Sequence, residues 1–237
     1  MPEESAIILN MRYADTEEGV FLRRPNRFEA YVSLCGKETL VHVKNTGRCR
    51  ELLVPGARVV LQRSGGGKRK TAHDLIAVYK KGLGLVNIDS QSPNKAAEEW
   101  LRSGRSFFGK LDLVKPEQNY GSSRIDFYLE KAGERILLEV KGCTLEREGV
   151  GYFPDAPTAR GSKHLRELAA SLEEGFKPFL AFVIAMPRVR KVIPNAETDP
   201  AFAEYFRKAL QAGVRVLLLR CLIRKDFMKI KGWEEMK

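Results

Sequence analysis

Short hydrophobic runs separated by glycine, proline and charged residues fill the first third of the chain. Five of these runs have the length of strands: GVFLRR, FEAYVSL, TLVHVK, ARVVLQR and DLIAVYK. Short strands with turn residues between them are typical of a small all-β barrel or sandwich. An OB-like barrel is one candidate, because it has five strands and commonly binds oligonucleotides. The pattern predicts a β-domain over residues 1–83.

From residue 84 onward, helical spacing alternates with continuous hydrophobic runs. Ser92–Pro93 is expected to cap and open a first helix that ends at Gly104, and Asp199–Pro200 opens a later helix that ends at Gly213. The run KPFLAFVIA is continuously apolar, as expected for a strand that is buried on both faces. The run VRVLLLRCLI is expected to form a final apolar strand. The order of elements predicts a mixed sheet flanked by helices over residues 84–237, in a two-domain chain that combines α+β and α/β features.

A further helix is predicted between those two, where Leu165, Leu168 and Leu172 recur at helical spacing. Asp155 or Ser162 is expected to cap it, and Gly175 to end it.

The segment RIDFYLEKAGERILLEVKG predicts two strands joined by a short polar loop at residues 131–134. Because strand residues alternate between faces, Ile125, Phe127 and Leu129 are expected on one face and Asp126 on the other.

Asp126, Glu139 and Lys141 are therefore expected to converge on one surface of the paired strands. Two carboxylates, with the Val140 carbonyl and waters, suit a hard divalent cation such as Mg²⁺ or Mn²⁺. Such an ion polarises a phosphoryl group, and Lys141 can orient the attacking water or stabilise developing charge. The arrangement resembles the PD-(D/E)xK nuclease signature, with Ile125 where that signature usually has proline. Two strands with solvated polar faces are the alternative explanation.

The helices offer additional candidates. Arg160, Lys163 and His164 share a polar helix face and can contact a scissile phosphate, although a lone histidine is often a surface residue. Glu98 and Glu99 of the first helix are candidates for a third acidic ligand, but surface glutamates are common on helices.

The formal net charge of +11 and the isoelectric point near 9.5 favour nucleic acid as the partner, because a basic surface attracts phosphate backbones. Any single basic run can also be a solvated face. The glycine-rich loop Ser64–Lys70, which contains Lys68 and Arg69, either touches phosphates or is a plain surface turn; it lacks P-loop spacing. The basic runs are Arg23–Arg27, Arg48 with Arg50, Ser64–Lys70 and Arg188–Lys191.

Other features narrow the class of protein. No hydrophobic run approaches the roughly 20 residues that a membrane-spanning helix needs. The acidic start MPEESAIILN lacks the basic region of a signal peptide, so a cytoplasmic protein is expected. The four cysteines are scattered, which argues against a disulfide framework or structural zinc and favours small buried side chains.

Several strings resemble the sugar fermentation stimulation protein A family: RPNRFEAYV, NTGRCRELLVPG, YGSSRIDFYL, LLEVKGCTL and GYFPDAPTARGSKHLREL. The matches span both halves of the chain. The resemblance implies an N-terminal OB-like domain, a C-terminal PD-(D/E)xK nuclease-like domain, and DNA binding. The family name derives from a sugar-utilisation phenotype, which suggests a regulatory role.

Residue by residue, the resemblance places the site at Asp126, Glu139 and Lys141, supported by Glu99. Arg160, Lys163 and His164 match the family's helix string. Four aromatic residues can stack bases on the barrel or form its core, and core is favoured for at least two of them. The barrel residues matching the family and suited to a binding face are Arg24, Arg27, Asn45 and Arg48; the aromatic residues are Tyr13, Phe21, Phe28 and Tyr31.

The hypothesis is a cytoplasmic DNA-binding protein with a Mg²⁺-dependent deoxyribonuclease site. No helix-turn-helix pattern supports base-specific readout, so DNA is expected to bind without strong sequence specificity. One alternative is a non-catalytic DNA-binding regulator that retains a nuclease fold. Another is a sensor of nucleotides or sugars, which would bind small molecules saturably and DNA weakly.

Overall fold

Strands from the first third of the chain form one sheet that closes on itself in the computed structural model, which describes residues 11–45, 47–64 and 70–236. Parallel pairing of β3 with β5 joins the two ends, so that β1 to β5 form a closed barrel in the order β1-β2-β3-β5-β4. The predicted five-stranded OB-like barrel is therefore confirmed. The strands are β1 (Thr16–Arg23), β2 (Glu29–Leu34), β3 (Lys37–Val43), β4 (Arg58–Arg63), β5 (His73–Lys80) and β6 (Gly84–Asn87).

The domain boundary lies slightly later than residue 83. β6 pairs with β5 in antiparallel fashion, so the barrel sheet continues to Asn87. The second domain then begins with helix α1 (Ser92–Arg102).

A second six-stranded sheet forms the C-terminal domain, in the order β15-β14-β12-β9-β8-β7. Its central strands β9, β12 and β14 are parallel, and the outer pairings are antiparallel. This is the predicted mixed sheet. Its strands are β7 (Leu113–Tyr120), β8 (Ser123–Lys131), β9 (Glu134–Cys143), β12 (Lys177–Ile184), β14 (Arg215–Ile223) and β15 (Met228–Glu235); the small sheet beside it contains β10 (Leu145–Arg147), β11 (Val150–Phe153) and β13 (Lys191–Pro194).

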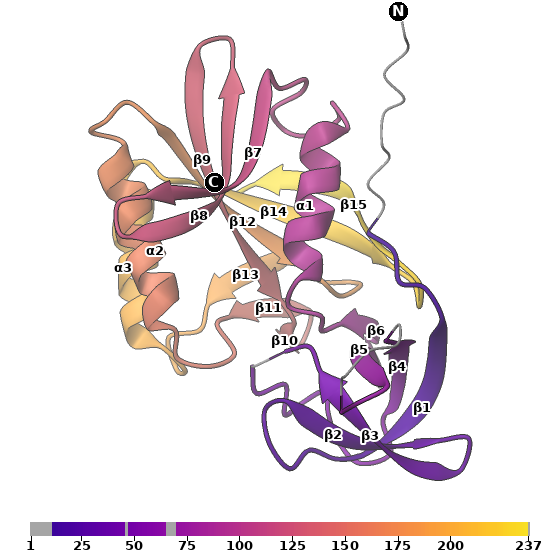
Figure 1. Cartoon of the computed structure of the whole chain (residues 1–237). Coiled ribbons are helices and arrows are strands. Elements are labelled where there is room, and N and C mark those ends of the chain that lie inside the picture. The colour runs from indigo at the N-terminus through magenta and orange to yellow at the C-terminus, as the bar shows by residue number, and fades with distance from the viewer. Residues whose placement is uncertain (1–10, 46, 65–69, 237) are drawn as a thin grey trace, which may run out of the picture.

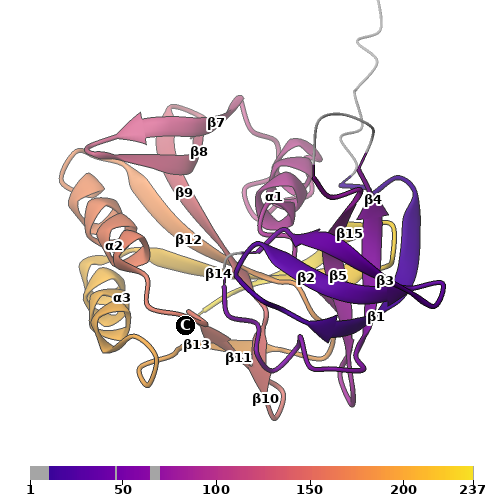
Figure 2. The same cartoon turned by 60° about the horizontal axis from the view of Figure 1, so that its bottom comes forward.

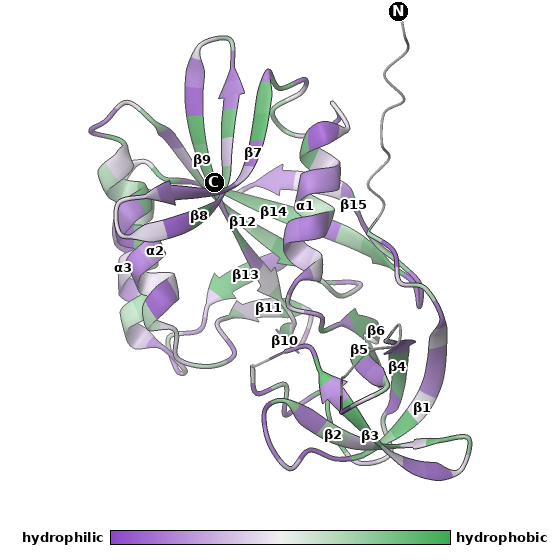
Figure 3. Ribbon diagram, viewed as in Figure 1, coloured by the Kyte–Doolittle hydropathy of each residue, from purple (hydrophilic) through white to green (hydrophobic). Residues whose placement is uncertain are grey.

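Helices cover both faces of this sheet. Helix α1 packs on one face, while α2 (Ala159–Ser171) and α3 (Pro200–Ala212) pack on the other, on the side away from the barrel (Figures 1 and 2). Hydrophobic residues run along β12 and β14 (Figure 3), and nearly all of β12 is buried, as expected for a strand enclosed by helices. No helix within the described ranges is long and apolar enough to cross a membrane.

The helix ends test the predicted caps. Asp199 caps α3 by accepting a hydrogen bond from Phe202 N, and Gly213 ends this helix in the left-handed conformation, as predicted. The cap predicted for α2 is wrong: Thr158 accepts from Gly161 N, because Ser162 lies inside the first turn. The first helix begins at Ser92 as predicted, but this hydroxyl donates to Asn87 and to a backbone carbonyl rather than capping the helix.

Candidate active site

The hairpin of β8 and β9 carries the two predicted carboxylates. Its backbone ladder runs from the turn at residues 132–133 to the pair Phe127–Leu138. One residue further along, Asp126 Oδ2 accepts a hydrogen bond from Val140 N at 2.8 Å. A side chain thus occupies a position that a backbone carbonyl would otherwise take, and the ladder ends at this carboxylate.

The strict alternation predicted for β8 also ends at Asp126. Phe127 and Leu129 pack in the hydrophobic cluster beneath α1, whereas Ile125 packs in the cluster beneath α2. The prediction that these three side chains share a face is therefore wrong at Ile125. The break turns Asp126 toward α1, where Asn94 Nδ2 donates to Asp126 Oδ1 at 2.7 Å.

Asn94 is a site residue that the sequence did not reveal. It lies in the first turn of α1, directly after the Ser92–Pro93 start. Only the packing of that turn on β8 and β9 brings its amide to Asp126. The one signal available beforehand was a polar residue close to a predicted helix start, which is too common to single out.

Glu139 is buried between β9 and α2, with 1% of its surface exposed. Its Oε1 contacts both Lys141 Nζ and His164 Nδ1. Its Oε2 is also buried and has no hydrogen-bond partner among the described residues. A buried carboxylate oxygen without a partner is costly, so this atom marks a position where a bound cation or a hydrogen-bond donor would be stabilising.

The two carboxylates have opposite pKa shifts. Burial alone would raise the pKa of Glu139, but Lys141 and the hydrogen bond from His164 outweigh burial and lower it. Burial, followed by repulsion from Glu139, raises the pKa of Asp126 to about 6, against the weaker attraction of Lys141. Asp126 is thus held close enough to Glu139 for the two carboxylates to repel each other, and a divalent cation between them would relieve this repulsion.

His164 is more deeply buried than predicted, with 2% of its surface exposed. Its second ring nitrogen, Nε2, accepts a hydrogen bond from Arg160 Nε at 3.3 Å, which leaves the proton on Nδ1 facing Glu139. Both ring nitrogens are therefore engaged. In this arrangement the ring orients Glu139, and a direct contact of His164 with phosphate stays a prediction.

The neighbouring cations of α2 differ in their availability. Arg160 is exposed beyond its contact with His164. Lys163 is half-buried, and its Nζ donates to the carbonyl of Ser122 at 2.6 Å, which ties α2 to the turn between β7 and β8. Of the two, Arg160 is the better placed for a phosphate.

The predicted third acidic ligand lies elsewhere. Glu99 accepts from Met11 N at 3.1 Å and pairs with Lys229 at 3.3 Å, on the β15 side of α1. It follows Asn94 by five residues, about 140° around the helix, so the two cannot face the same strands. Glu98 pairs with Arg102. Within the described residues, no group of three or more His, Cys, Asp and Glu side chains is arranged to hold a metal ion.

Two of the predicted phosphate-binding residues of the barrel make structural contacts. The guanidinium of Arg24 donates to four backbone carbonyls, those of Arg27, Asn45, Gly47 and Arg48, at 2.7 to 3.0 Å. The amide of Asn45 donates to Ile88 O and accepts from Gly47 N. These side chains shape the loop after β3, and their contact with phosphate stays a prediction.

Arg27, in the loop between β1 and β2, and Arg48, in the loop after β3, are both exposed and remain candidates for phosphate contact. Lys68 and Arg69 lie outside the described residues.

The four aromatic candidates of the barrel divide as expected between core and surface. Tyr13 and Phe21 are buried. Tyr31 is half-buried, with the Arg23 guanidinium 3.9 Å from its ring centre. Phe28 is the exposed one, with 53% of its surface accessible, and is available to stack on a base.

A cleft of about 340 Å³ lies between the barrel and the C-terminal domain. Arg27 lines it from the barrel, and Pro93, Gly142 and Thr158 line it from the C-terminal domain. Gly142 is required by close packing, because a Cβ there would lie 2.7 Å from Pro93 Cγ. Pro93 and Gly142 directly adjoin Asn94 and Lys141 in the chain, so the cleft lies next to the segments that carry the site.

The fold defines a class of two-domain proteins in which an N-terminal OB barrel precedes a mixed sheet flanked by helices. Comparison with known proteins places the chain within that class. Residues 22–88 match the family model described as the SfsA N-terminal OB domain, and residues 91–227 match that of the sugar fermentation stimulation protein RE domain. The chain belongs to the sugar fermentation stimulation protein family.

Individual relatives agree with this assignment. A sugar fermentation stimulation protein homolog from Desulfitobacterium hafniense is 50% identical over 216 residues, covering 91% of this chain and 93% of the relative. A homolog from Ruminiclostridium cellulolyticum is 45% identical over 227 residues, covering 96% and 100%. A solved structure, described as Pyrococcus furiosus SfsA in complex with Ca²⁺, superposes with a TM-score of 0.83 at 29% identity, covering 95% of this chain and 96% of that one.

Proposed function

We propose that this chain is a DNA-binding protein that hydrolyses phosphodiester bonds with the help of a divalent cation, Mg²⁺ or Mn²⁺. The observation that carries the proposal is the buried Oε2 of Glu139, which has no partner among the described residues while Lys141 and His164 both contact the other oxygen. The spacing of Asp126, Glu139 and Lys141 on two paired strands also resembles the PD-(D/E)xK nuclease signature.

Asp126 and the open oxygen of Glu139 would hold the cation, with the Val140 carbonyl as a further predicted ligand. When bound, the ion would polarise the phosphoryl group and lower the pKa of an attacking water. The Ca²⁺ complex described for the Pyrococcus furiosus relative supports a divalent cation in this fold, since Ca²⁺ and Mg²⁺ both prefer oxygen ligands.

The remaining side chains have distinct roles in this proposal. His164 orients Glu139, and Arg160 in turn orients His164. The ammonium of Lys141 lies at the carboxylate pair, where it stabilises negative charge that develops on the phosphate. Asn94 keeps Asp126 turned toward the site.

DNA is the proposed partner because the net charge of +11 includes the exposed Arg27, Arg48 and Arg160 beside the cleft and the site. These arginines would contact phosphates and would not distinguish between bases, so DNA binding without strong sequence specificity is expected. The family name fits a link to the regulation of sugar utilisation, and the expected location is cytoplasmic.

A non-catalytic DNA-binding regulator is the second candidate. It is favoured by one pair of contacts: Lys141 already forms an ion pair with Glu139 and His164 already contacts the same oxygen, while the expected third acid is engaged elsewhere. In such a protein the cluster would be a structural remnant of a nuclease site.

Incubation of the protein with single- and double-stranded DNA in Mg²⁺, Mn²⁺ or EDTA distinguishes the two. Products that require metal and disappear in Glu139→Gln support the nuclease. The matched control is Glu134→Gln, because Glu134 lies on the same strand with an exposed ion pair to Lys177. Gel shifts by wild type and Glu139→Gln, with cleavage by neither, would support the regulator.

A further inference from the structure

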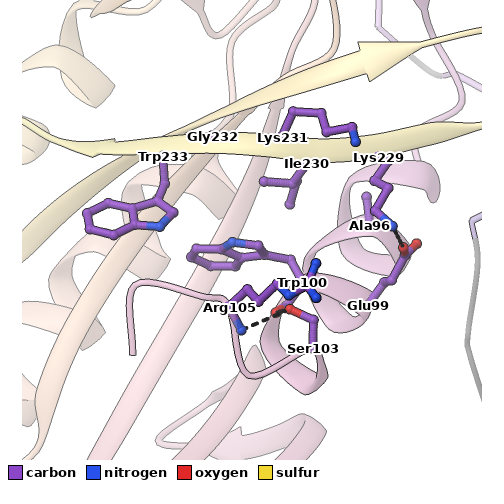
Figure 4. A pocket seen from close by; sticks show the side chains of 10 residues that line it. All are labelled: Ala96, Glu99, Trp100, Ser103, Arg105, Lys229, Ile230, Lys231, Gly232 and Trp233. Carbon is purple, nitrogen blue, oxygen red and sulfur yellow. Dashed lines mark hydrogen bonds and ion pairs between the residues drawn. The ribbon is translucent and has the colours of Figure 1, made fainter. Parts of the chain in front are cut away.

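A pocket of about 610 Å³ lies between α1 and β15 (Figure 4). The sequence contains two tryptophans, Trp100 and Trp233, and both line this pocket. Trp100 belongs to the side of α1 that packs against β15, whereas Asn94 reaches β8 from the other side. The pocket is therefore separate from the Glu139 site.

Trp233 presents an aromatic surface to this pocket. It is 41% exposed, which is unusual for a residue of its size. Phe107 holds the ring in an edge-to-face contact, with ring centres 5.1 Å apart and an interplanar angle of 88°. Because Phe107 fixes the orientation of the indole, a flat ligand can stack on its exposed part with little loss of side-chain entropy.

Cations outnumber acids around this aromatic surface. Three basic residues and one carboxylate line the pocket, namely Arg105, Lys229, Lys231 and Glu99. The carboxylate is already engaged, since it pairs with Lys229 (Figure 4). It also accepts a hydrogen bond from Met11 N. No acidic partner of Arg105 or Lys231 occurs among the described residues. The pocket thus favours an anion.

We propose that this pocket binds a nucleotide, with the base stacked on Trp233 and the phosphate held by Arg105 and the neighbouring lysines. An aromatic ring beside unmatched cations suits a planar aromatic group that carries negative charge. A free nucleotide and a nucleotide within a single strand share this chemistry. The inference goes beyond the proposed function and does not rest on it, because the pocket can be filled whether or not Glu139 supports cleavage.

Tryptophan fluorescence tests this directly, since the entire tryptophan signal comes from the pocket. The full chain in EDTA is titrated with adenosine monophosphate, adenosine, inorganic phosphate and a short single-stranded oligonucleotide. Saturable quenching is expected with the monophosphate or the oligonucleotide, weaker binding with adenosine, and none with phosphate at equal concentration. Saturation by the monophosphate indicates a free-nucleotide site, whereas saturation by the oligonucleotide alone indicates a subsite for a strand.

Two variants and a matched control separate stacking from charge. Trp233→Ala is expected to weaken binding about 10-fold or more, the range expected for loss of a base–aromatic stack. Arg105→Gln is expected to weaken the binding of the monophosphate but not the binding of adenosine. Arg207→Gln is the control, because Arg207 is likewise an exposed arginine but lies on α3, on the opposite face of the sheet.

The two indole N–H signals in a nitrogen–proton correlation spectrum provide a second readout and show whether each variant is folded. Equal affinity of wild type and folded Trp233→Ala would overturn the proposal. So would unchanged indole signals in wild type at saturating monophosphate and oligonucleotide, or equal responses to inorganic phosphate and the monophosphate. Because EDTA suppresses cleavage, and Glu139→Gln is expected to bind as wild type does, these failures are distinct from failure of the nuclease proposal.

Discussion

Two buried carboxylates, Asp89 at the domain junction and Glu139 in the sheet, differ in whether both of their oxygens have hydrogen-bond partners. Asp89 is 2% exposed and fully hydrogen-bonded. Its Oδ2 contacts Tyr13 OH at 3.2 Å and Lys44 Nζ at 2.8 Å, and its Oδ1 accepts from Gln91 N at 2.9 Å. Glu139 is equally buried, but both of its contacts fall on one oxygen and leave the other open.

This difference distinguishes a buried carboxylate with a structural role from one with a proposed functional role. The partners of Asp89 come from the N-terminal segment, the end of the barrel and the start of α1, so this carboxylate connects the two domains. Both oxygens of Asp89 have partners. In the proposed function, the open buried oxygen of Glu139 is the position where a ligand would complete the site. Four predictions test this contrast, from the largest effect to the smallest.

Glu139→Gln should lower the rate of metal-dependent cleavage by about 10²- to 10³-fold or more, because a metal ligand contributes several kcal/mol of transition-state stabilisation. The amide keeps the shape of the side chain and can still accept from His164, so the fold should persist. Initial cleavage rates, with circular dichroism as a check of folding, measure this. Loss of activity in Glu134→Gln as well would contradict the specific role of Glu139.

Asp89→Ala should act on stability instead. It leaves the Lys44 ammonium and the Tyr13 hydroxyl without their partner, which costs roughly 3 to 4 kcal/mol in the free energy of unfolding. Urea denaturation measures the loss, and cleavage by the folded fraction should be retained. The control is Asp226→Ala, which removes an exposed ion pair with Arg12 and should cost less than about 1 kcal/mol. Equal losses in the two variants would sink the structural role of Asp89.

Asp126 predicts a pH dependence of stability. Its folded pKa of about 6 exceeds the ordinary 3.8, so the folded chain keeps this proton over a range where the unfolded chain releases it. The contribution of Asp126 to stability is therefore present below about pH 4 and falls as pH rises toward 6, by about 2 to 3 kcal/mol at most.

The measurement is the unfolding free energy of wild type and Asp126→Asn across this range. The amide does not titrate, so the difference between the two proteins should shift in favour of the variant as pH rises. Parallel pH curves would show that the Asp126 carboxyl is not perturbed. Asp226→Asn, which removes an exposed carboxyl, is the control variant.

Arg24 and Arg48 of the barrel provide a second comparison between a side chain with a structural role and one with a proposed binding role. Arg24→Ala should lower stability by roughly 2 kcal/mol, since four carbonyls lose a charged donor. Arg48→Ala should change stability by no more than about 0.5 kcal/mol, but weaken DNA binding and reduce the salt slope by about 1. Denaturation and salt-dependent gel shifts separate the two effects. A loss of stability in Arg48→Ala together with weaker DNA binding by a stable Arg24→Ala would contradict the roles given to these arginines.

The regular elements were predictable because their signals are local. Hydrophobic spacing located the five barrel strands, the buried run of β12 and the three helices, and the Asp199–Pro200 and Gly213 signals set the ends of α3. The strands that were missed have no such signal. β7 is largely exposed and contains Pro116, and β15 buries only Met228 and Ile230. The remaining missed strands, β6, β10, β11 and β13, have three or four residues each, so their formation depends on neighbouring strands.

By itself, the sequence determined the two-domain architecture, the family, and the identity of Asp126, Glu139 and Lys141 as neighbours on a hairpin. Only the tertiary structure decided what each side chain contacts. It ended the alternation at Asp126, brought Asn94 to that carboxylate, buried His164 against Glu139 and turned Glu99 away. Periodicity reports the face of one element, whereas a site depends on how helices and strands distant in the chain are packed against each other.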